Sequence, residues 1–232
     1  MHIQDEPMKT VKPETKRTRV LIVDDHPMTR AGLVHVINHQ EDLCVCSEVE
    51  NAAKALDALD ACKPDLVLAD ITLPDKSGLE LIKDIKALRP GLPILVISMH
   101  DESLYAERVL RAGGRGYIMK QEGGKKLMEA IRQVLSGQIY VSEKMSAKIL
   151  EIFSGRRSQT EDSPLEQLSD REFDVFQLIG QGKTTREIAD HLHLSVKTVE
   201  VHRANIRKKL KLGSGTDVVH QAIRWVESQK PN

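Results

Sequence analysis

Five short apolar segments recur between residues 20 and 119, and each is followed by a stretch with the apolar spacing of a helix. The segments are VLIV (20–23), LCVCSEV (43–49), LVLA (66–69), ILVIS (94–98) and GYIM (116–119). Segments that are apolar throughout are typical of strands covered on both faces. Five strands alternating with five helices predict an α/β domain with a doubly wound (βα)5 parallel sheet.

The pattern changes after Pro164 and is helical from there on. Ser169 with Glu172, and Thr184 with Glu187, have the spacing of capping boxes that open two helices. A third helix over 196–210 and a fourth over 216–226 follow. The second and third helices, joined by a short turn, predict a helix-turn-helix pair inside an all-α four-helix domain.

A chain of 232 residues exceeds one typical domain, so two domains are expected. The segment SGRRSQTEDS (154–163) has no apolar residue and separates the two patterns. We expect four regions along the chain. They are a flexible N-terminal tail (1–18), the α/β domain (19–138), a linker with a short helix (139–164) and the helix-turn-helix domain (165–228).

The composition favours a soluble globular protein, with 40% apolar and 29% charged residues. No apolar run approaches the roughly 18–20 residues of a membrane helix, and the polar N-terminus does not resemble a secretory signal. We therefore expect a cytoplasmic protein with no membrane partner. Cys44, Cys46 and Cys62 lack zinc-like spacing, and we interpret them as small core residues.

The zero net charge conceals an uneven distribution of charge. Residues 183–211 carry eight basic and three acidic side chains, concentrated on the second and third helices of the all-α domain. Such a concentration is expected of a face that binds nucleic acid. It is also compatible with ordinary solvated surface, so charge alone leaves both interpretations open.

Polar side chains follow four of the five predicted strands. Asp24 and Asp25 end the first strand, Asp70 the third and Ser98 the fourth, and Lys120 follows the fifth. The carboxyl ends of parallel strands share one edge, so these groups should converge there. Three converging carboxylates need a cation, and Mg2+ fits their oxygen ligands. The site predicts in-line attack of Asp70 on a phosphoryl group.

These segments, VLIVDDHP, LVLADITLPDKSGLEL, ILVIS and GYIMK, resemble the receiver domain of two-component response regulators over about residues 18–137. The resemblance implies a flavodoxin-like fold and phosphorylation of Asp70 by a cognate histidine kinase. It implies that Asp25, Asp70 and the backbone carbonyl of Thr72 bind Mg2+ directly, and that Asp24 binds it through water.

The same resemblance assigns further roles around the phosphoryl group. Ser98 and Lys120 would contact its oxygens, and Tyr117 matches the switch aromatic that turns inward when Ser98 moves. Thr72 and His100 would flank the route of the attacking water.

The stretch LSDREFDVFQLIGQGKTTREIADHLHLSVKTVEVHRANIRKKL is similar to the LuxR-type (NarL/FixJ) DNA-binding domain over about residues 165–227. The family implies a third helix in the major groove of double-stranded DNA and a fourth helix in dimerisation. Phe173 departs from the polar residue common at its position. The candidate DNA contacts are Thr184, Thr185, Lys197, Thr198, Glu200, Val201, His202, Arg203, Ala204, Arg207 and Lys208.

Within that set, Glu200, Val201 and Ala204 would face bases, and Glu200 fits either a cytosine contact or a pair with Arg203. His191 and His193 are interpreted as a surface turn, because no third metal ligand is spaced nearby.

Together the two resemblances predict a response regulator whose phosphorylation switches DNA binding and transcription. The expected partners are the kinase, DNA, RNA polymerase and a second copy of the chain when phosphorylated or on DNA. In the unphosphorylated state we expect the receiver to pack on the third helix and block DNA. We expect no enzyme activity beyond phosphorylation and dephosphorylation of the receiver itself.

Two alternatives remain at this point. One is a DNA-binding regulator that is switched by a ligand or by dimerisation, without phosphate. The other is an aspartyl-phosphate phosphatase of the haloacid-dehalogenase type, which needs a second acid two residues after the first, where Thr72 stands. The sequence does not identify the kinase, the target genes, the operator or the direction of regulation.

Overall fold

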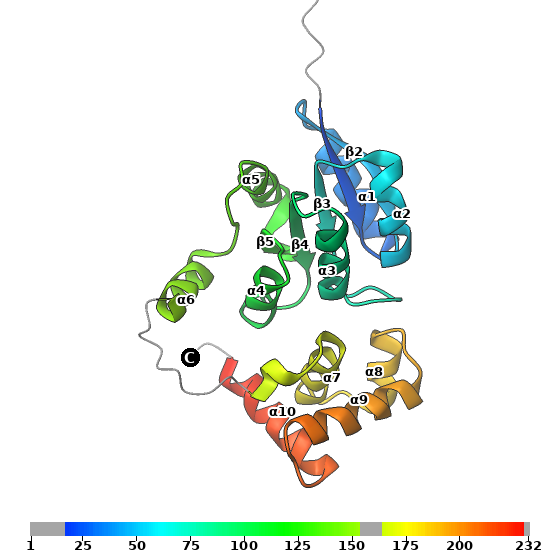
Figure 1. The fold of residues 1–232 in the computed structure, drawn as a ribbon, viewed down its shortest axis with the longest axis vertical. Helices are drawn as coiled ribbons and strands as arrows, with labels where there is room; N and C mark the ends of the chain where they lie inside the picture. Colours follow the sequence, from blue (N-terminus) through cyan, green and yellow to red (C-terminus); the bar gives the residue numbers. More distant parts are fainter. Residues whose placement is uncertain (1–16, 154–163, 230–232) are drawn as a thin grey trace, which may run out of the picture.

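A computed structural model of the chain describes residues 17–153 and 164–229. Residues 1–16 of the expected N-terminal tail (1–18) lie outside the described residues. The first strand begins at Thr18, so the tail ends one residue earlier than expected. The polar part of the linker, residues 154–163, also lies outside them. The described residues form an α/β domain and a helical domain that lies below it in Figure 1.

The α/β domain is built on a five-stranded parallel sheet in the order β2-β1-β3-β4-β5. The strands are β1 (Thr18–Val23), β2 (Leu43–Val49), β3 (Leu66–Ala69), β4 (Ile94–Ser98) and β5 (Gly116–Met119). Every residue of β3 and β4 is buried, as expected of strands that are apolar throughout. This strand order is the doubly wound arrangement, so the predicted fold class is confirmed.

Helices cover both faces of the sheet (Figure 1). They are α1 (Pro27–Asn38), α2 (Ala52–Cys62), α3 (Gly78–Leu88), α4 (Glu102–Arg111) and α5 (Gly123–Leu135), with a 3-10 turn, η1 (Lys120–Glu122), before α5. Leu33 of α1 and Ile131 of α5 pack with Val20 and Ile22 on one face. Ala55 of α2, with residues of α3 and α4, packs on the other.

The second domain is helical throughout, as expected. It contains η2 (Pro164–Gln167), α7 (Asp170–Gly180), α8 (Thr185–His191), α9 (Val196–Lys209) and α10 (Gly215–Gln229). Both predicted capping boxes are present: Ser169 exchanges hydrogen bonds with Glu172, and Thr184 with Glu187. These caps satisfy backbone N–H groups that have no partner within the helix. They fix where α7 and α8 begin.

The linker begins as an addition to the sheet. Tyr117 N donates to Tyr140 O over 2.9 Å, and Tyr140 N donates to Arg115 O over 3.0 Å, so Tyr140 forms a parallel bridge with Gly116. A Cβ at Gly116 would lie 2.8 Å from the Tyr140 carbonyl oxygen, so only glycine allows this approach. Helix α6 (Glu143–Phe153), the expected short linker helix, follows and packs on α4.

The three cysteines are free. Cys62 is buried, and its Sγ lies 2.9 Å from that of Cys46, where the register of β1 against β2 shifts. Burial and the shared proton with Cys62 raise the pKa of Cys46 to about 12, so this thiol stays protonated at neutral pH. Cys46 and Cys62 therefore pack as small core groups.

None of the helices within residues 17–153 and 164–229 combines the length and the apolar character that a membrane crossing requires.

Gly78 fixes the loop that carries Asp70. Its N–H donates to the Ile71 carbonyl over 2.7 Å, and a Cβ there would lie 2.3 Å from the Asp70 backbone oxygen. We expect Gly78→Ala to lower the free energy of unfolding by about 2 kcal/mol, because backbone atoms must move. Urea unfolding monitored by circular dichroism measures this change.

Gly32→Ala is the matched control, because a Cβ at Gly32 in α1 meets no atom within 4 Å. Alanine should raise stability there by roughly 0.5–1 kcal/mol. Equal effects of the two substitutions would contradict the steric argument.

Candidate phosphoacceptor site and helix-turn-helix face

Three carboxylates meet at the carboxyl edge of the sheet, as the strand ends predict. Asp24 and Asp25 follow β1, and Asp70 follows β3. Ligand atoms of these residues and of His26 all lie within 4.8 Å of one another. Asp24 and Asp70 are buried, with 0% and 3% of their surface exposed.

Lys120 supplies the positive charge that holds this cluster together. Its Nζ lies 2.7 Å from Asp70 Oδ2 and 2.6 Å from Asp24 Oδ2. Burial raises the pKa of Asp70 to about 6, against the opposing effect of Lys120. Burial alone would lower the pKa of Lys120, but Asp70 and Asp24 outweigh it and the pKa is raised. The lysine therefore stays charged between the two carboxylates.

Further polar groups surround Asp70. Thr72 N donates to Asp70 Oδ1 over 3.3 Å, and Thr72 Oγ1 lies 3.1 Å from His100 Nε2. Burial lowers the pKa of His100 to about 4, so the ring is neutral at pH 7. Ser98 is fully buried, and its Oγ accepts a hydrogen bond from His100 N. Tyr117 points inward, and its hydroxyl donates to the His100 carbonyl over 2.8 Å.

The cluster has room for additional positive charge. Asp24 Oδ2 and Asp25 Oδ1 are buried and have no hydrogen-bond partner among the described residues. Lys120 Nζ lies 2.6 Å from Asp24 Oδ2, and His26 Nδ1 lies 2.6 Å from Asp25 Oδ1. Buried charged oxygens without hydrogen bonds are costly. The residues therefore fit a hard divalent cation with oxygen ligands.

The helical domain lies against this edge of the sheet, which the sequence did not predict. His193, in the turn after α8, places Nε2 3.3 Å from Asp25 Oδ2. Arg171 of α7 donates through a buried N–H to the carbonyl of Leu73 over 2.9 Å, in the loop that follows Asp70. In Figure 1, α7 and α8 lie beyond the carboxyl ends of the strands.

Helix α4 of the receiver forms the rest of this interface. Tyr105 donates a buried hydrogen bond to Asp174 over 2.8 Å. The guanidinium of Arg108 lies 3.9 Å from the ring centre of Phe173 and also contacts Asp170. The Phe173 ring stands edge-on to the ring of Tyr105, with their centres 5.5 Å apart, and edge-on to the ring of Trp225, with their centres 5.3 Å apart. Phe173, the one apolar departure from the family pattern, was thus the available sequence signal for this contact.

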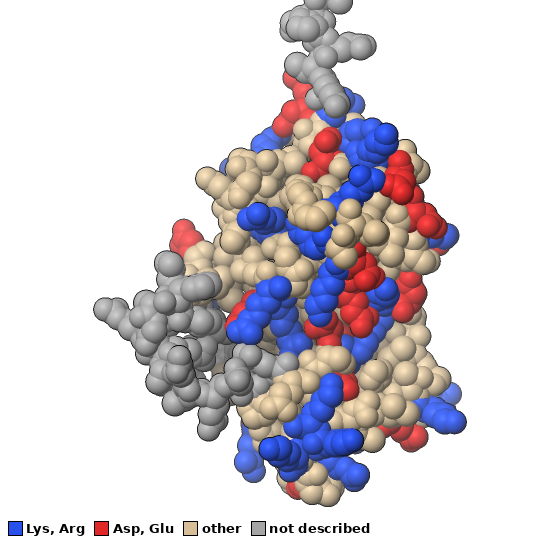
Figure 2. Space-filling model, in the orientation of Figure 1, with Lys and Arg blue, Asp and Glu red and all other residues tan. Residues whose placement is uncertain are grey.

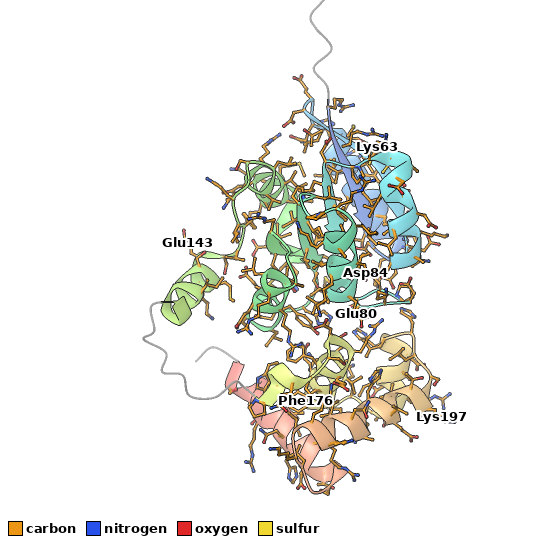
Figure 3. The ribbon with its side chains drawn as sticks, viewed as in Figure 1. Lys63, Glu80, Asp84, Glu143, Phe176 and Lys197 are labelled. Carbon is orange, nitrogen blue, oxygen red and sulfur yellow. The ribbon has the colours of Figure 1, made fainter. Side chains whose placement is uncertain are left out.

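The expectation that the receiver packs on the third helix is wrong for this structure. The outer face of α9 is exposed, including Lys197, Glu200, Val201, Ala204, Arg207 and Lys208. Figure 3 shows Lys197 directed away from the receiver, and Figure 2 shows Lys and Arg side chains gathered on the lower part of the helical domain. The receiver contacts α7 instead, because Asp170, Arg171 and Asp174 find partners there.

Of the remaining predicted DNA contacts, Thr184 is exposed, and Thr185, Thr198, His202 and Arg203 are half-buried. The carboxylate of Glu187 accepts from both the N–H and the hydroxyl of Thr184, so this helix N-terminus already has an acidic partner. Arg203 is half-buried beside the Thr185 hydroxyl, 3.5 Å away, and is not paired with Glu200. Thr198 lies in the cap of α9 with Ser195, and His202 is half-buried.

Comparison with known proteins assigns both domains. The model "Response regulator receiver domain" matches residues 20–132, and the model "Bacterial regulatory proteins, luxR family" matches residues 166–222. Oxygen regulatory protein NreC of Staphylococcus carnosus (strain TM300) is 33% identical over 210 residues, which cover 89% of this chain and 97% of that protein. NreC of Staphylococcus aureus (strain MRSA252) is 34% identical with the same coverage.

Solved structures agree. RcsB from Salmonella enterica serovar Typhimurium, bound to promoter P1flhDC in the presence of phosphomimetic BeF3-, has a TM-score of 0.59 at 25% identity and covers 89% of this chain and 98% of that chain. A LuxR-family response regulator from Aurantimonas sp. SI85-9A1 has a TM-score of 0.55 at 30% identity and covers 60% of this chain and 99% of that chain.

A receiver fold with an acidic pocket, joined to a LuxR-type helix-turn-helix domain, defines a response regulator. The chain belongs to the LuxR-type response regulators of two-component systems, of the NarL family.

The buried carboxyl of Asp174 gives the interface a dependence on pH. Burial raises its pKa to about 6, although Arg171, Tyr105 and Arg108 favour the charged form; Asp170 adds to the rise. The carboxyl of Asp174 therefore binds its proton more tightly in the folded state than in the unfolded chain, where the pKa of an aspartate is about 3.9. The cost of burying the charge is present above about pH 6 and is relieved as the pH falls toward 4.

We therefore expect Asp174→Asn to be more stable than the native protein at pH 7.5, and to lose about half of that gain at pH 5. The difference should be roughly 1–3 kcal/mol in the free energy of unfolding, measured by urea titration at both pH values. Asp57→Asn, at an exposed position in α2, is the control. Parallel pH dependence of the Asp174 variant and the native protein would rule out the assignment.

Proposed function

We propose that Asp70 accepts a phosphoryl group from a cognate histidine kinase, with Mg2+ in the acidic pocket, and that this reaction switches DNA binding. The observation that carries the proposal is the position of Lys120 Nζ, 2.7 Å from Asp70 Oδ2, inside a pocket with two further carboxylates. An ammonium there can hold the oxygens of an incoming phosphoryl group.

The transfer proceeds by in-line attack. An oxygen of Asp70 forms a bond to phosphorus while the phosphorus–nitrogen bond of the donor phosphohistidine breaks. The electron pair leaves with the imidazole nitrogen, which then takes a proton from water. Lys120, which contacts Asp70, and the buried Ser98 hydroxyl orient the phosphoryl oxygens.

Mg2+, when bound, offsets negative charge on the transferring group. Asp25, Asp70 and the backbone carbonyl of Thr72 would hold it, with Asp24 contributing through water. The two buried oxygens without hydrogen-bond partners among the described residues support this placement.

In this proposal the protein catalyses only two reactions, both on itself. They are the phosphorylation of Asp70 and the hydrolysis of the resulting acyl phosphate. Thr72 and His100, whose side chains touch, flank the approach to Asp70 and would limit the attacking water. The phosphatase alternative is disfavoured, because the position of its second acid holds Thr72. A regulator that is switched without phosphate is also disfavoured, because it does not need a lysine placed between two buried carboxylates.

The exposed face of α9 is the proposed DNA-binding surface. Glu200, Val201 and Ala204 would face bases in the major groove of double-stranded DNA, and basic neighbours such as Lys197 and Arg207 would meet phosphates. The exposure of these side chains supports the proposal. So does the similarity to RcsB, which has been solved as a complex with DNA and as dimers on DNA.

The proposed partners follow from this function. They are the kinase, double-stranded DNA, RNA polymerase and a second copy of the chain when it is phosphorylated or on DNA. The cytoplasm is the proposed location, where kinase and DNA are both accessible. Phosphorylation would shift the population away from the arrangement in which α7 covers α4.

Labelling with a small phosphodonor tests the phosphoacceptor. With radiolabelled acetyl phosphate and Mg2+, we expect the native protein to form an acid-stable, base-labile acyl phosphate. Asp70→Asn should abolish the label, because an amide cannot form it. Gel autoradiography after acid and base treatment measures the outcome.

Asp65→Asn is the matched control, since Asp65 lies before β3, at the opposite end of the strand from Asp70. It should label like the native protein. Equal labelling of Asp70→Asn would refute the assignment.

Salt dependence tests the DNA-binding face. Arg207→Ala should weaken binding by a similar factor on all sequences and reduce the slope of log affinity against log salt by about 1, because one phosphate contact is lost. Arg115→Ala makes the same charge change on an exposed receiver residue and should leave the slope unchanged. Fluorescence anisotropy with labelled duplexes gives both values. An unchanged slope for Arg207→Ala would exclude a phosphate contact by this residue.

A further inference from the structure

Asp25 is approached by two histidines, one from each domain. His26 Nδ1 lies 2.6 Å from Asp25 Oδ1, and His193 Nε2 lies 3.3 Å from Asp25 Oδ2. His26 belongs to the receiver, whereas His193 comes from the turn between α8 and α9. Asp25 is also the carboxylate that the proposed function assigns to Mg2+. A group from the DNA-binding domain thus occupies an oxygen of the proposed metal pocket.

The turn presents His193 in a defined conformation. Its φ is +53°, in the left-handed region, and the next residue, Leu194, donates its N–H to the Ala189 carbonyl over 2.8 Å. Residues other than glycine adopt this conformation infrequently, and histidine does so more readily than most. The backbone therefore holds the ring at the start of the helix-turn-helix connection.

Contacts of α7 fix the distance between this turn and the receiver. Arg171 donates to the Leu73 carbonyl, only three positions beyond Asp70 in the chain, over 2.9 Å. Lys83 of α3 pairs with Asp170 at 2.8 Å, and in Figure 3 Glu80 lies near the end of α3 that is closer to the helical domain. These anchors hold the helical domain against the loop that leads away from Asp70.

We propose that His193 competes with Mg2+ for Asp25, so that docking of the DNA-binding domain and filling of the metal pocket oppose each other. The inference rests on the proposed function, because it concerns the same pocket. His193 Nε2, 3.3 Å from Asp25 Oδ2, fills the space beside that oxygen. A cation bound to the same carboxylate oxygen needs the space that the imidazole ring fills.

The coupling acts in both directions. If metal binding weakens the contact of His193, then removing His193 strengthens metal binding by the same factor. The DNA-binding domain therefore senses the filling of the receiver pocket directly, before any rearrangement of the receiver. Filling the pocket would also loosen the turn that begins α9, the proposed DNA-binding helix.

The chain carries an internal reporter for this coupling. Trp225 is its single tryptophan and lies in α10 of the helical domain. Its ring is 5.3 Å from that of Phe173, which in turn contacts Tyr105 and Arg108 of the receiver. A change in the docking of the two domains therefore alters the surroundings of the tryptophan, although the metal binds in the other domain.

The experiment compares Mg2+ binding by the full chain and its His193→Gly variant. Glycine suits the left-handed backbone at this position, so the turn should remain intact. Isothermal calorimetry gives the dissociation constant, and Trp225 fluorescence reports the docking of the domains. We expect His193→Gly to bind Mg2+ about fivefold more tightly. The native protein should show a saturable fluorescence change on adding Mg2+.

His220→Ala, at an exposed position in α10, is the control and should leave both measurements unchanged. A second variant, Tyr105→Phe, removes the hydrogen bond to Asp174 without touching the pocket. By weakening docking it should also tighten Mg2+ binding. If Mg2+ affinity is the same in the native protein and in His193→Gly, the competition does not exist.

Phosphorylation of the same samples separates this inference from the proposed function. If acetyl phosphate labels Asp70 in the native protein but His193→Gly leaves Mg2+ affinity unchanged, only the competition by His193 is refuted. If Asp70 is not labelled in either protein, the proposed function itself fails.

Discussion

The placement of one ammonium group between two buried carboxylates is the constraint on which the rest of this structure depends. Lys120 Nζ contacts Asp70 and Asp24, whose side chains have almost no exposure to solvent. Without that charge, two carboxylates on neighbouring strands would repel each other and take up protons. The strand order places β1 beside β3, and so sets the spacing between these acids. The chemistry of the receiver is therefore a direct result of its topology.

A second set of charges joins the two domains, and it does so at the edge where the phosphoacceptor lies. Asp174 is buried between Tyr105 and Arg171, and Arg108 packs over Phe173. A buried polar interface is specific, because every group in it needs its partner. It is also weak in net energy for the same reason, since water competes for each group. An interface of this kind suits a switch: it defines one docked arrangement while keeping the cost of leaving it small.

The sequence predicted those features that repeat with a regular period or follow a strand. All five strands, the capping boxes at Ser169 and Thr184, and the convergence of Asp24, Asp70 and Lys120 are of this kind. It did not predict the docking of α7, because the contact of Arg171 with Leu73 joins residues 98 positions apart and no pattern links them. The polar residues of α7 have the spacing of a solvated surface, and only the other domain makes them buried. The packing expected on the third helix was wrong for that reason.

The bridge between Tyr140 and β5 has a consequence for how the chain tolerates change. The linker leaves the receiver through a single parallel bridge, in which Tyr140 pairs with Gly116 at the edge of the sheet. Inserting one residue between α5 and Tyr140 would place a different residue opposite Gly116 and turn the Tyr140 side chain to the other side of the sheet. The length of the Ser136–Ile139 connection is therefore fixed as firmly as a core position.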